Sequence, residues 1–511
     1  MFLTRLPVTF CLAACAAGLF WNTQPAATTR TPPDEGEQLA KIRCSTCHLY
    51  PEPDLLPKHI WQSSVLPQMG YQLGIYPHDS VRMRLIEHGP GGVRVREANV
   101  FPEQPQVYLE DWAKIQAFYL KNAPDSLINL TQKPLEKKLP YFTTRIPDLK
   151  LSTPSATLVQ FRPGGGLYLG DANTQRLYWI NQKLQVEKAA NLAEGVVGLQ
   201  RDASGAYVTI MGSFSPTDAP VGNVIYIPDN APQAELLLEN LQRPVHSAWA
   251  DFNADGLTDA VVCEFAKWTG GLTLHLQQAD GAFERILLRN KPGAIKSYVR
   301  DLNADGHLDV IALFGQGDEG IYRFINDGHG DFTEECVLRF PPSWGSSSFR
   351  LVDVNADGKE DIVYTCGDNA DYTPILKPYH GVRFFTNDGA GNYTQSFFYP
   401  LHGAYDAIPA DFDGDGDLDI AALSFFPDYR HRPEAAFVLL DNNGASGYEA
   451  RTFPEVTQGR WIVMDAGDLE GDGDMDLVLG PLTFEVVPDG GEIKRWLSAG
   501  VPFVVLENTS R

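Results

Sequence analysis

The stretch DFNADGLTD, residues 251–259, decides the fold because the chain repeats it four more times. The later copies are DLNADGHLD from Asp301, DVNADGKED from Asp353, DFDGDGDLD from Asp411 and DLEGDGDMD from Asp468. Their starts lie 50, 52, 58 and 57 residues apart. A regular period of this length indicates a stacked or radial repeat, in which each unit buries its faces against its neighbours.

Each copy has the ligand pattern of a calcium loop. Oxygen-bearing side chains stand at positions 1, 3, 5 and 9, a backbone carbonyl is expected at position 7, and glycine at position 6 allows a sharp turn. Such hard oxygen ligands select Ca²⁺, so about five ions are predicted. An EF-hand is excluded, because its Glu at position 12 is Val262 here and the flanks read as strands. The predicted ligands are Asp251, Asn253, Asp255, Leu257 and Asp259; Asp301, Asn303, Asp305, His307 and Asp309; Asp353, Asn355, Asp357, Lys359 and Asp361; Asp411, Asp413, Asp415, Asp417 and Asp419; and Asp468, Glu470, Asp472, Asp474 and Asp476.

The segment 151–511 is predicted to form an all-β propeller. Dividing about 360 residues by the repeat period gives about seven blades, so two blades must lack the motif. Residues 157–190 and 195–235 have the strand content for them. The terminal strand 501–507 is expected to close the ring beside a strand near 141–151, within a linker spanning 129–150.

The repeats resemble the FG-GAP or VCBS family, whose calcium loops decorate seven-bladed propellers such as that of integrin α-subunits. The resemblance covers roughly residues 150–511. It implies a calcium-bound propeller. It implies little about activity.

The pentapeptide Cys44-Ser45-Thr46-Cys47-His48 matches the C-x-x-C-H pattern of c-type haem attachment. Two thiols on one helical turn can reach the two vinyl groups of a porphyrin, and the adjacent imidazole can bind the iron. A zinc site would need two further close ligands, and a thioredoxin-type redox pair would need a βαβ context. The sequence therefore predicts one covalent haem.

Residues 37–128 are predicted to form a small all-α domain around that haem. Apolar residues recur at helical spacing in 58–73, with a kink expected at Pro67, and in 111–120. The second helix resembles the one that crosses the first helix in c-type cytochromes. Met69, in W-x3-V-x3-M, resembles the axial Met of short cytochromes; the alternatives are that Met69 is a core residue, or that Met83, His59, His78 or His88 is the sixth ligand. The two regions together resemble bacterial cytochrome–VCBS fusion proteins.

The amino-terminal residues predict export. Residues 1–14 hold one early positive charge and an apolar run, and Leu12-Ala13-Ala14-Cys15 resembles a bacterial lipobox with Cys15 as lipid anchor. A plain secretory signal or an uncleaved anchor helix is the alternative. Residues 15–36 read as a flexible tether. The expected location is the periplasm or outer membrane of a Gram-negative bacterium, and Cys263, Cys336 and Cys366 are expected to be buried small side chains.

A ligand face is expected opposite the acidic loops. There the long connections between second and third strands should emerge, beside side chains that enter the central channel near the start of the inner strands. A polar ring at this place would suit an anionic or sugar-like ligand, although propeller channels are usually wet and polar. The candidate residues are His246, Lys296, Arg350, Asp406 and Arg460 on the inner strands, with Asp318 and His380 in the neighbouring loops.

Three functions follow as hypotheses. The first is extracytoplasmic electron transfer by a haem protein whose propeller binds a redox partner protein or a small-molecule or carbohydrate ligand. The second is a propeller oxidoreductase that acts on a sugar or alcohol and passes electrons to its own haem, although the sequence holds no dinucleotide fingerprint or P-loop. The third is a calcium-dependent binding or adhesion module. A net charge of -24 argues against nucleic acid as a partner.

Overall fold

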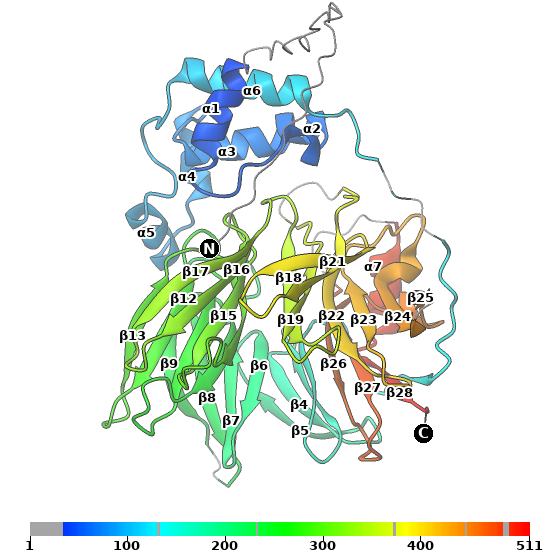
Figure 1. Cartoon of the computed structure of the whole chain (residues 1–511). Coiled ribbons are helices and arrows are strands. Elements are labelled where there is room, and N and C mark those ends of the chain that lie inside the picture. The colour runs from blue at the N-terminus through cyan, green and yellow to red at the C-terminus, as the bar shows by residue number, and fades with distance from the viewer. Residues whose placement is uncertain are drawn as a thin grey trace, which may run out of the picture.

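A helical region lies on one face of a ring of β-sheets in the computed structural model (Figure 1). The structure describes residues 34–128, 130, 133–230, 233–370, 375–444, 447–483 and 490–510. The predicted signal segment 1–14 and Cys15 lie outside the described residues. The amino-terminal helices are α1 (Glu35–Cys44), α2 (Lys58–Ile60), α3 (Leu66–Gln72), α4 (Asp79–Leu85), α5 (Pro90–Glu97) and α6 (Leu109–Asn122).

Helices α1 and α6 pack closely together, with α6 burying one apolar stripe. Trp112, Ile115, Phe118 and Tyr119 of α6 are all buried, as their spacing predicted. Gly36 makes the close approach possible, because a Cβ there would lie 2.4 Å from the Lys114 carbonyl oxygen and 2.9 Å from the Phe118 Cβ. Asp34 caps α1 by accepting a hydrogen bond from the Gly36 N–H at 2.9 Å.

Replacing Gly36 with Val should loosen this helix pair. The added side chain would force α1 away from α6, at a cost of about 2 kcal/mol for an overpacked contact. Amide hydrogen exchange in α1 and α6 should therefore accelerate roughly 30-fold, while exchange in the β-sheets should not change. Lys41→Ala, on the exposed side of the same helix, is the control. Equal exchange rates in Gly36→Val and the unmodified chain would contradict the proposed contact.

The segment 58–73, in which a kink at Pro67 was predicted, contains a widened turn just before that proline. Trp61–Val65 form a π-helical turn between α2 and α3. Pro67 has no N–H to donate to the preceding turn, so the ladder of hydrogen bonds is interrupted there. Trp61 is buried and donates its indole N–H to the Pro53 carbonyl at 2.8 Å.

Seven four-stranded antiparallel sheets confirm the predicted seven-bladed propeller. The two blades without the acidic motif are β2–β5 and β6–β9, close to the segments predicted for them. The first three blades comprise β2 (Ala156–Phe161), β3 (Leu167–Asp171), β4 (Arg176–Ile180), β5 (Val186–Asn191); β6 (Val196–Arg201), β7 (Gly205–Ile210), β8 (Gly222–Pro228), β9 (Glu235–Leu241); and β10 (Pro244–Ala250), β11 (Asp259–Glu264), β12 (Gly271–Gln277), β13 (Phe283–Arg289).

The remaining four blades carry the other acidic motifs. They comprise β14 (Ala294–Arg300), β15 (Asp309–Phe314), β16 (Gly320–Asn326), β17 (Phe332–Arg339); β18 (Ser346–Val352), β19 (Asp361–Cys366), β20 (Gly381–Asn387), β21 (Tyr393–Pro400); β22 (Ala404–Ala410), β23 (Asp419–Ser424), β24 (Phe437–Asn442), β25 (Tyr448–Arg451); and β26 (Trp461–Gly467), β27 (Asp476–Pro481), β28 (Val504–Asn508), β1 (Phe142–Arg145). A further helix, α7 (Glu492–Ala499), precedes β28.

The ring closes by a strand from each end of the propeller. The outermost strand of the seventh blade is β1, which pairs antiparallel with β28 from Phe142–Asn508 to Arg145–Val505. The innermost strands β2 and β26 then lie side by side, so the first and seventh blades are neighbours.

Every innermost strand has a register shift at its second residue. The seven shifts fall between Ala156 and Leu158 in the first blade and at the equivalent place in every other blade. A bulge changes the direction of the side chains that follow it. The third residues of these strands therefore form one ring around the axis: Leu158, Gly198, His246, Lys296, Ser348, Asp406 and Val463.

Two of the three propeller cysteines are buried, as expected, but Cys336 is exposed. The expectation was wrong for Cys336 because it lies on β17, the outermost strand of its blade. Among the helices that the structure describes, none has both the length and the apolar character to cross a membrane.

Candidate functional site

The five acidic loops share one backbone conformation. Each joins the first strand of its blade to the second, so all five lie on one face of the ring. In each loop the glycine at position 6 donates its N–H to the carboxylate at position 1, at 2.7 to 3.0 Å. These glycines have positive φ, and so do Ala254, Ala304 and Ala356 at position 4 of the first three loops. The loops therefore turn back on themselves with their acidic side chains facing inward.

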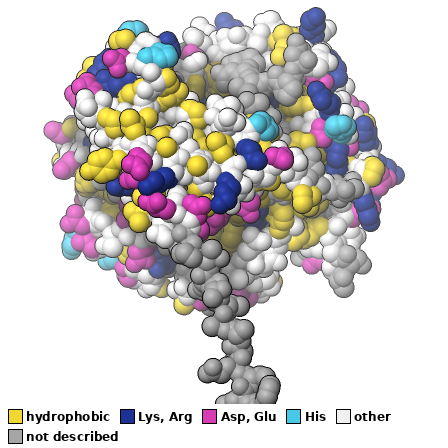
Figure 2. Space-filling model, turned by 90° about the horizontal axis from the view of Figure 1, so that it is seen from above, with side chains coloured by type: hydrophobic (Ala, Val, Ile, Leu, Met, Phe, Trp, Pro, Cys, Tyr) yellow, Lys and Arg dark blue, Asp and Glu magenta, His cyan; other side chains and the backbone are white. Residues whose placement is uncertain are grey.

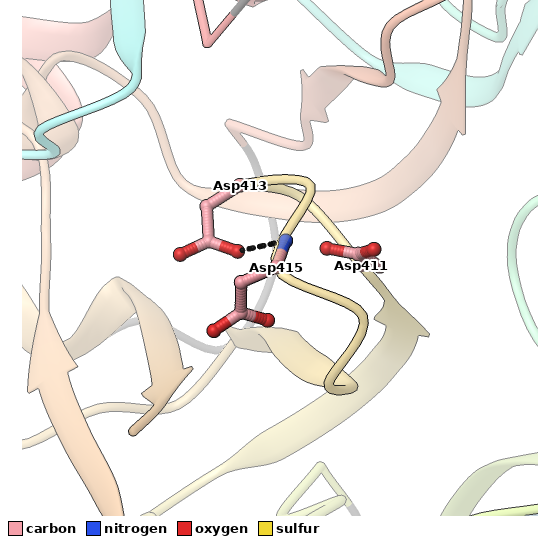
Figure 3. A group of neighbouring side chains, drawn as sticks. All are labelled: Asp411, Asp413 and Asp415. Atoms are coloured by element: carbon pink, nitrogen blue, oxygen red, sulfur yellow. Dashed lines mark hydrogen bonds between the residues drawn. The ribbon is translucent and has the colours of Figure 1, made fainter. Parts of the chain in front are cut away.

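The fourth loop shows the resulting cluster of oxygens (Figure 3). Carboxylate oxygens of Asp411, Asp413 and Asp415 all lie within 4.8 Å of one another. The Asp415 N–H donates to Asp413 Oδ1 at 3.1 Å, which holds the two side chains at adjacent corners of the turn. Asp468, Glu470 and Asp476 of the fifth loop form a second such group. Oxygen-only groups of this kind suit a hard cation.

The aspartate at position 9 has a structural task that the motif alone did not reveal. Asp309 is fully buried, and its two oxygens accept the N–H groups of Leu302 and Asn326, each at 2.8 Å. The same two bonds recur at Asp259, Asp361, Asp419 and Asp476. This residue therefore connects its loop to the third strand, whether or not it also binds a metal.

The partner at the end of the third strand was missed by sequence reasoning. Asn326 donates its side-chain amide to the carbonyl of Phe252 in the preceding blade at 2.8 Å, and Asn508 does the same to Phe412 at 2.7 Å. A repeated signal was present, because NDGHGDF from Asn326 and NDGAGNY from Asn387 both follow a third strand.

The fifth loop carries acidic oxygens that no hydrogen-bond donor of the described chain reaches. These are Glu470 Oε2 and Asp474 Oδ1, which are both buried and accept no hydrogen bond from the described residues. Burial and the neighbouring Asp476 raise the pKa of Glu470 to about 7. Burial and Asp472 raise the pKa of Asp474 to about 6. Such crowded, desolvated carboxylates favour a bound cation, so these residues fit calcium.

The predicted ligand-face residues divide into two groups. His246, Lys296, Arg350 and Asp406 lie on innermost strands, where Arg350 donates to Asp406 at 2.7 Å across the fifth and sixth blades. The others contact neighbouring side chains. The Arg460 guanidinium carbon lies 3.6 Å from the Phe425 ring centre, and Asp318 forms an ion pair with Arg289 at 2.9 Å. His380 is 1% exposed.

The helical region lies over the face where the ligand was expected. Glu87 accepts hydrogen bonds from the Thr217 hydroxyl at 2.9 Å and the Asp218 N–H at 2.9 Å, both in the β7–β8 connection. Phe101 packs edge-on against Trp268, and Tyr379 donates to the Leu55 carbonyl at 2.8 Å. These connections, all between second and third strands, therefore bind the helices.

A cavity opens instead on the acidic-loop face. It has a volume of about 640 Å³ and lies between the seventh, first, second and third blades. Its lining includes Gln160, Arg162, Arg201 and His246, together with Asp468 of the fifth acidic loop. Burial lowers the pKa of His246 to about 3, assisted by the charge of Lys296, so its imidazole is neutral.

The C-x-x-C-H motif begins at Cys44, the last residue of α1. Cys44 is half-buried beside the core of the helical region, Cys47 is exposed, and both thiols are free. His48 is 7% exposed, and its Nδ1 lies 2.9 Å from the Leu49 carbonyl oxygen. If Nδ1 carries the hydrogen and donates it to that carbonyl, Nε2 is unprotonated. This is the tautomer that can bind a metal.

The candidate sixth ligands occupy different environments. Met69 is half-buried and packs against the same apolar cluster as Cys44. Met83 is 67% exposed, and His59, His78 and His88 are exposed as well. Seen from the helix side, the molecule shows hydrophobic side chains gathered between charged ones (Figure 2). Exposed apolar residues of the helical region are Ile42, Met83, Val93, Tyr108 and Leu109.

Comparison with known proteins agrees with the architecture. A family model described as "FG-GAP-like repeat" matches residues 251–312 and 301–364, so the chain contains FG-GAP-like repeats on a seven-bladed propeller. A search of curated proteins gave no match.

A search of solved structures found matches at low identity. One is "BBS1N in complex with ARL6DN", with 11% identity and a TM-score of 0.43 over 73% of this chain and 97% of that chain. Another is a streptogramin B lyase, with 11% identity and a TM-score of 0.46 over 72% and 98%. A third is virginiamycin B lyase from Staphylococcus aureus, with 12% identity and a TM-score of 0.44 over 71% and 98%.

Proposed function

We propose that this chain is an exported, lipid-anchored haem protein for extracytoplasmic electron transfer, with a calcium-stabilised propeller that binds a ligand or partner. FG-GAP-like repeats on a propeller favour a binding module, which is the general part of the proposal. The observation that carries the haem part is His48, because its buried imidazole is oriented through Nδ1 and follows two free thiols. Haem attachment outside the cytoplasm also agrees with the predicted lipobox at Cys15.

The residues of the helical region fit a covalent haem. Cys44 and Cys47 would hold the porphyrin, His48 would bind the iron through Nε2, and Met69 is the proposed sixth ligand because it packs beside Cys44. A haem supplies one-electron exchange when bound. The aromatic core around Cys44, which includes Trp61 and Tyr119, would exclude water from that side.

The calcium part of the proposal rests on the acidic loops. The inward-facing carboxylates of Asp411, Asp413 and Asp415 would hold one ion, and the four other loops would each hold one more. These ions would stiffen the face on which the cavity opens, because the loops of neighbouring blades are linked by side chains such as Asn326.

Haem content tests the proposal directly. The full chain, produced in a host that matures c-type cytochromes, should contain one haem per chain in a pyridine haemochrome assay. The double variant Cys44→Ser/Cys47→Ser should contain none, because it has no sulfur at either position to form a thioether bond.

The matched control is Cys336→Ser, which removes an exposed propeller thiol and should retain one haem. A haem-free full chain, or a double variant that retains covalent haem, would refute the electron-transfer function. The binding function of the propeller would then stand alone.

A further inference from the structure

The cavity on the acidic-loop face has the size of a small-molecule site. Its volume of about 640 Å³ lies within the range of roughly 300–1,000 Å³ typical of ligand pockets. Its lining includes His246 of the ring of third residues, the turn at Arg162–Gly165, and Asp468 and Gly471 of the fifth acidic loop. The helices occupy the opposite face, so a ligand would enter from the acidic-loop side (Figure 1).

The charge of the lining is opposite to that of the chain. Arg162 and Arg201 both line the cavity, and Asp468 is the one carboxylate among the residues found to line it. The whole chain carries a net charge of -24. The two guanidinium groups of the lining favour an anionic ligand beside them, because low-dielectric walls strengthen the attraction between opposite charges.

Acidic side chains outside the cavity lining orient the two guanidinium groups. Arg162 donates to Glu187 at 2.7 Å and Arg201 pairs with Asp229. Arg162 also lies over the ring of Tyr168, with 5.7 Å between its guanidinium carbon and the ring centre. A guanidinium has five N–H donors, so donors remain to bind a carboxylate when one or two are occupied.

The cavity also offers neutral hydrogen-bonding groups. The neutral imidazole of His246 and the amide of Gln160 both line it. Lys296 occupies the next place in the ring and lies 5.3 Å from the Tyr298 ring centre. Hydroxyl groups of a ligand would hydrogen-bond to these neutral groups. An anionic group of the same ligand would pair with the arginines.

We propose that this cavity binds a sugar acid, with its carboxylate at Arg162 and Arg201 and its hydroxyls toward Gln160 and His246. The volume accommodates a monosaccharide or disaccharide, and a bidentate arginine contact is the geometry that carboxylates favour. This inference rests on the binding part of the proposed function and needs no haem.

Calorimetric titration of the calcium-loaded full chain tests the site with D-glucuronate as the probe. Glucuronate should bind, and D-glucose, which lacks the carboxylate, should bind at least tenfold more weakly. Sodium sulfate should not displace glucuronate at equal concentration, because it lacks the hydroxyl pattern. Absence of glucuronate binding, equal affinity for glucose, or equal competition by sulfate would each overturn the proposal.

The variant Arg162→Gln should weaken glucuronate binding at least tenfold. Arg300→Gln is the matched control, since Arg300 also pairs with a surface glutamate, Glu360, but does not line the cavity; its affinity should stay within twofold. Arg201→Gln replaces the first variant if Arg162→Gln fails to fold. Unchanged affinity in a folded arginine variant would overturn the site. A full chain that contains no haem but binds glucuronate would refute the haem function and leave this site standing.

Discussion

Removing calcium with EGTA is expected to lower the melting temperature of the purified protein by at least about 10 °C. A ligand that binds only the folded state stabilises it by about 4 kcal/mol per site at a thousandfold excess over Kd, and the five proposed sites would act on one ring. In the absence of a cation, the crowded carboxylates of Asp411, Asp413 and Asp415 repel one another. Differential scanning calorimetry, with metal analysis of the same sample, would measure both the shift and the bound calcium.

Calcium should restore the melting temperature, whereas magnesium should not, because Mg²⁺ demands a smaller octahedral shell and dehydrates reluctantly. A protein that contains no calcium after purification in its presence, or that melts at the same temperature with and without EGTA, would contradict the metal assignment of all five loops.

Replacing Asp309 with Ala is expected to destabilise the propeller by about 3 kcal/mol, both with calcium and in EGTA. The reason is that two N–H groups, of Leu302 and Asn326, would lose their acceptor at a buried place, at about 1–3 kcal/mol for each unsatisfied group. Urea unfolding in the two conditions measures the effect.

The control is Asp305→Ala at position 5 of the same loop. Asp305 is exposed and accepts local hydrogen bonds from His307 and Asn303. Its loss should cost little in EGTA but should remove part of the stabilisation by calcium. If Asp309→Ala were as stable as the unmodified chain in EGTA, position 9 would act only as a metal ligand.

The repeat predicted the propeller because its period and its chemistry agreed. Five copies at spacings of 50 to 58 residues left room for two unmarked blades, and the structure has them. The pairing of β1 with β28 lies where a closing strand was expected, because the carboxyl end supplies only three strands of the seventh blade and the segment before the first blade supplies the fourth. Local patterns therefore sufficed for the architecture and for the helix at 109–122.

The position of the cavity could not be read from local patterns. The long connections were expected to bind a ligand, but Glu87 and Phe101 of the helical region contact two of them. That contact joins residues more than a hundred positions apart and leaves no periodic signal. Arg162 and Arg201 were missed for a related reason, since they lie in blades without the acidic motif.

The partner of each position-9 aspartate was missed because motif reasoning assigned all loop carboxylates to a metal. Asp309 is buried and already bonded to two backbone groups, so burial rather than residue type distinguishes it from Asp305. Burial of a single side chain within a polar motif follows from the tertiary fold and not from its neighbours in sequence.

The seventh blade has a consequence for the order in which the chain folds. Its outer strand, residues 142–145, is synthesised before any other strand, yet its partner, residues 504–508, is made last. During synthesis the backbone N–H and C=O groups of residues 142–145 therefore have no partner strand until residues 504–508 have left the ribosome. Loss of residues 504–508 would therefore leave strand 142–145 without its partner, and such an unpaired strand edge promotes aggregation.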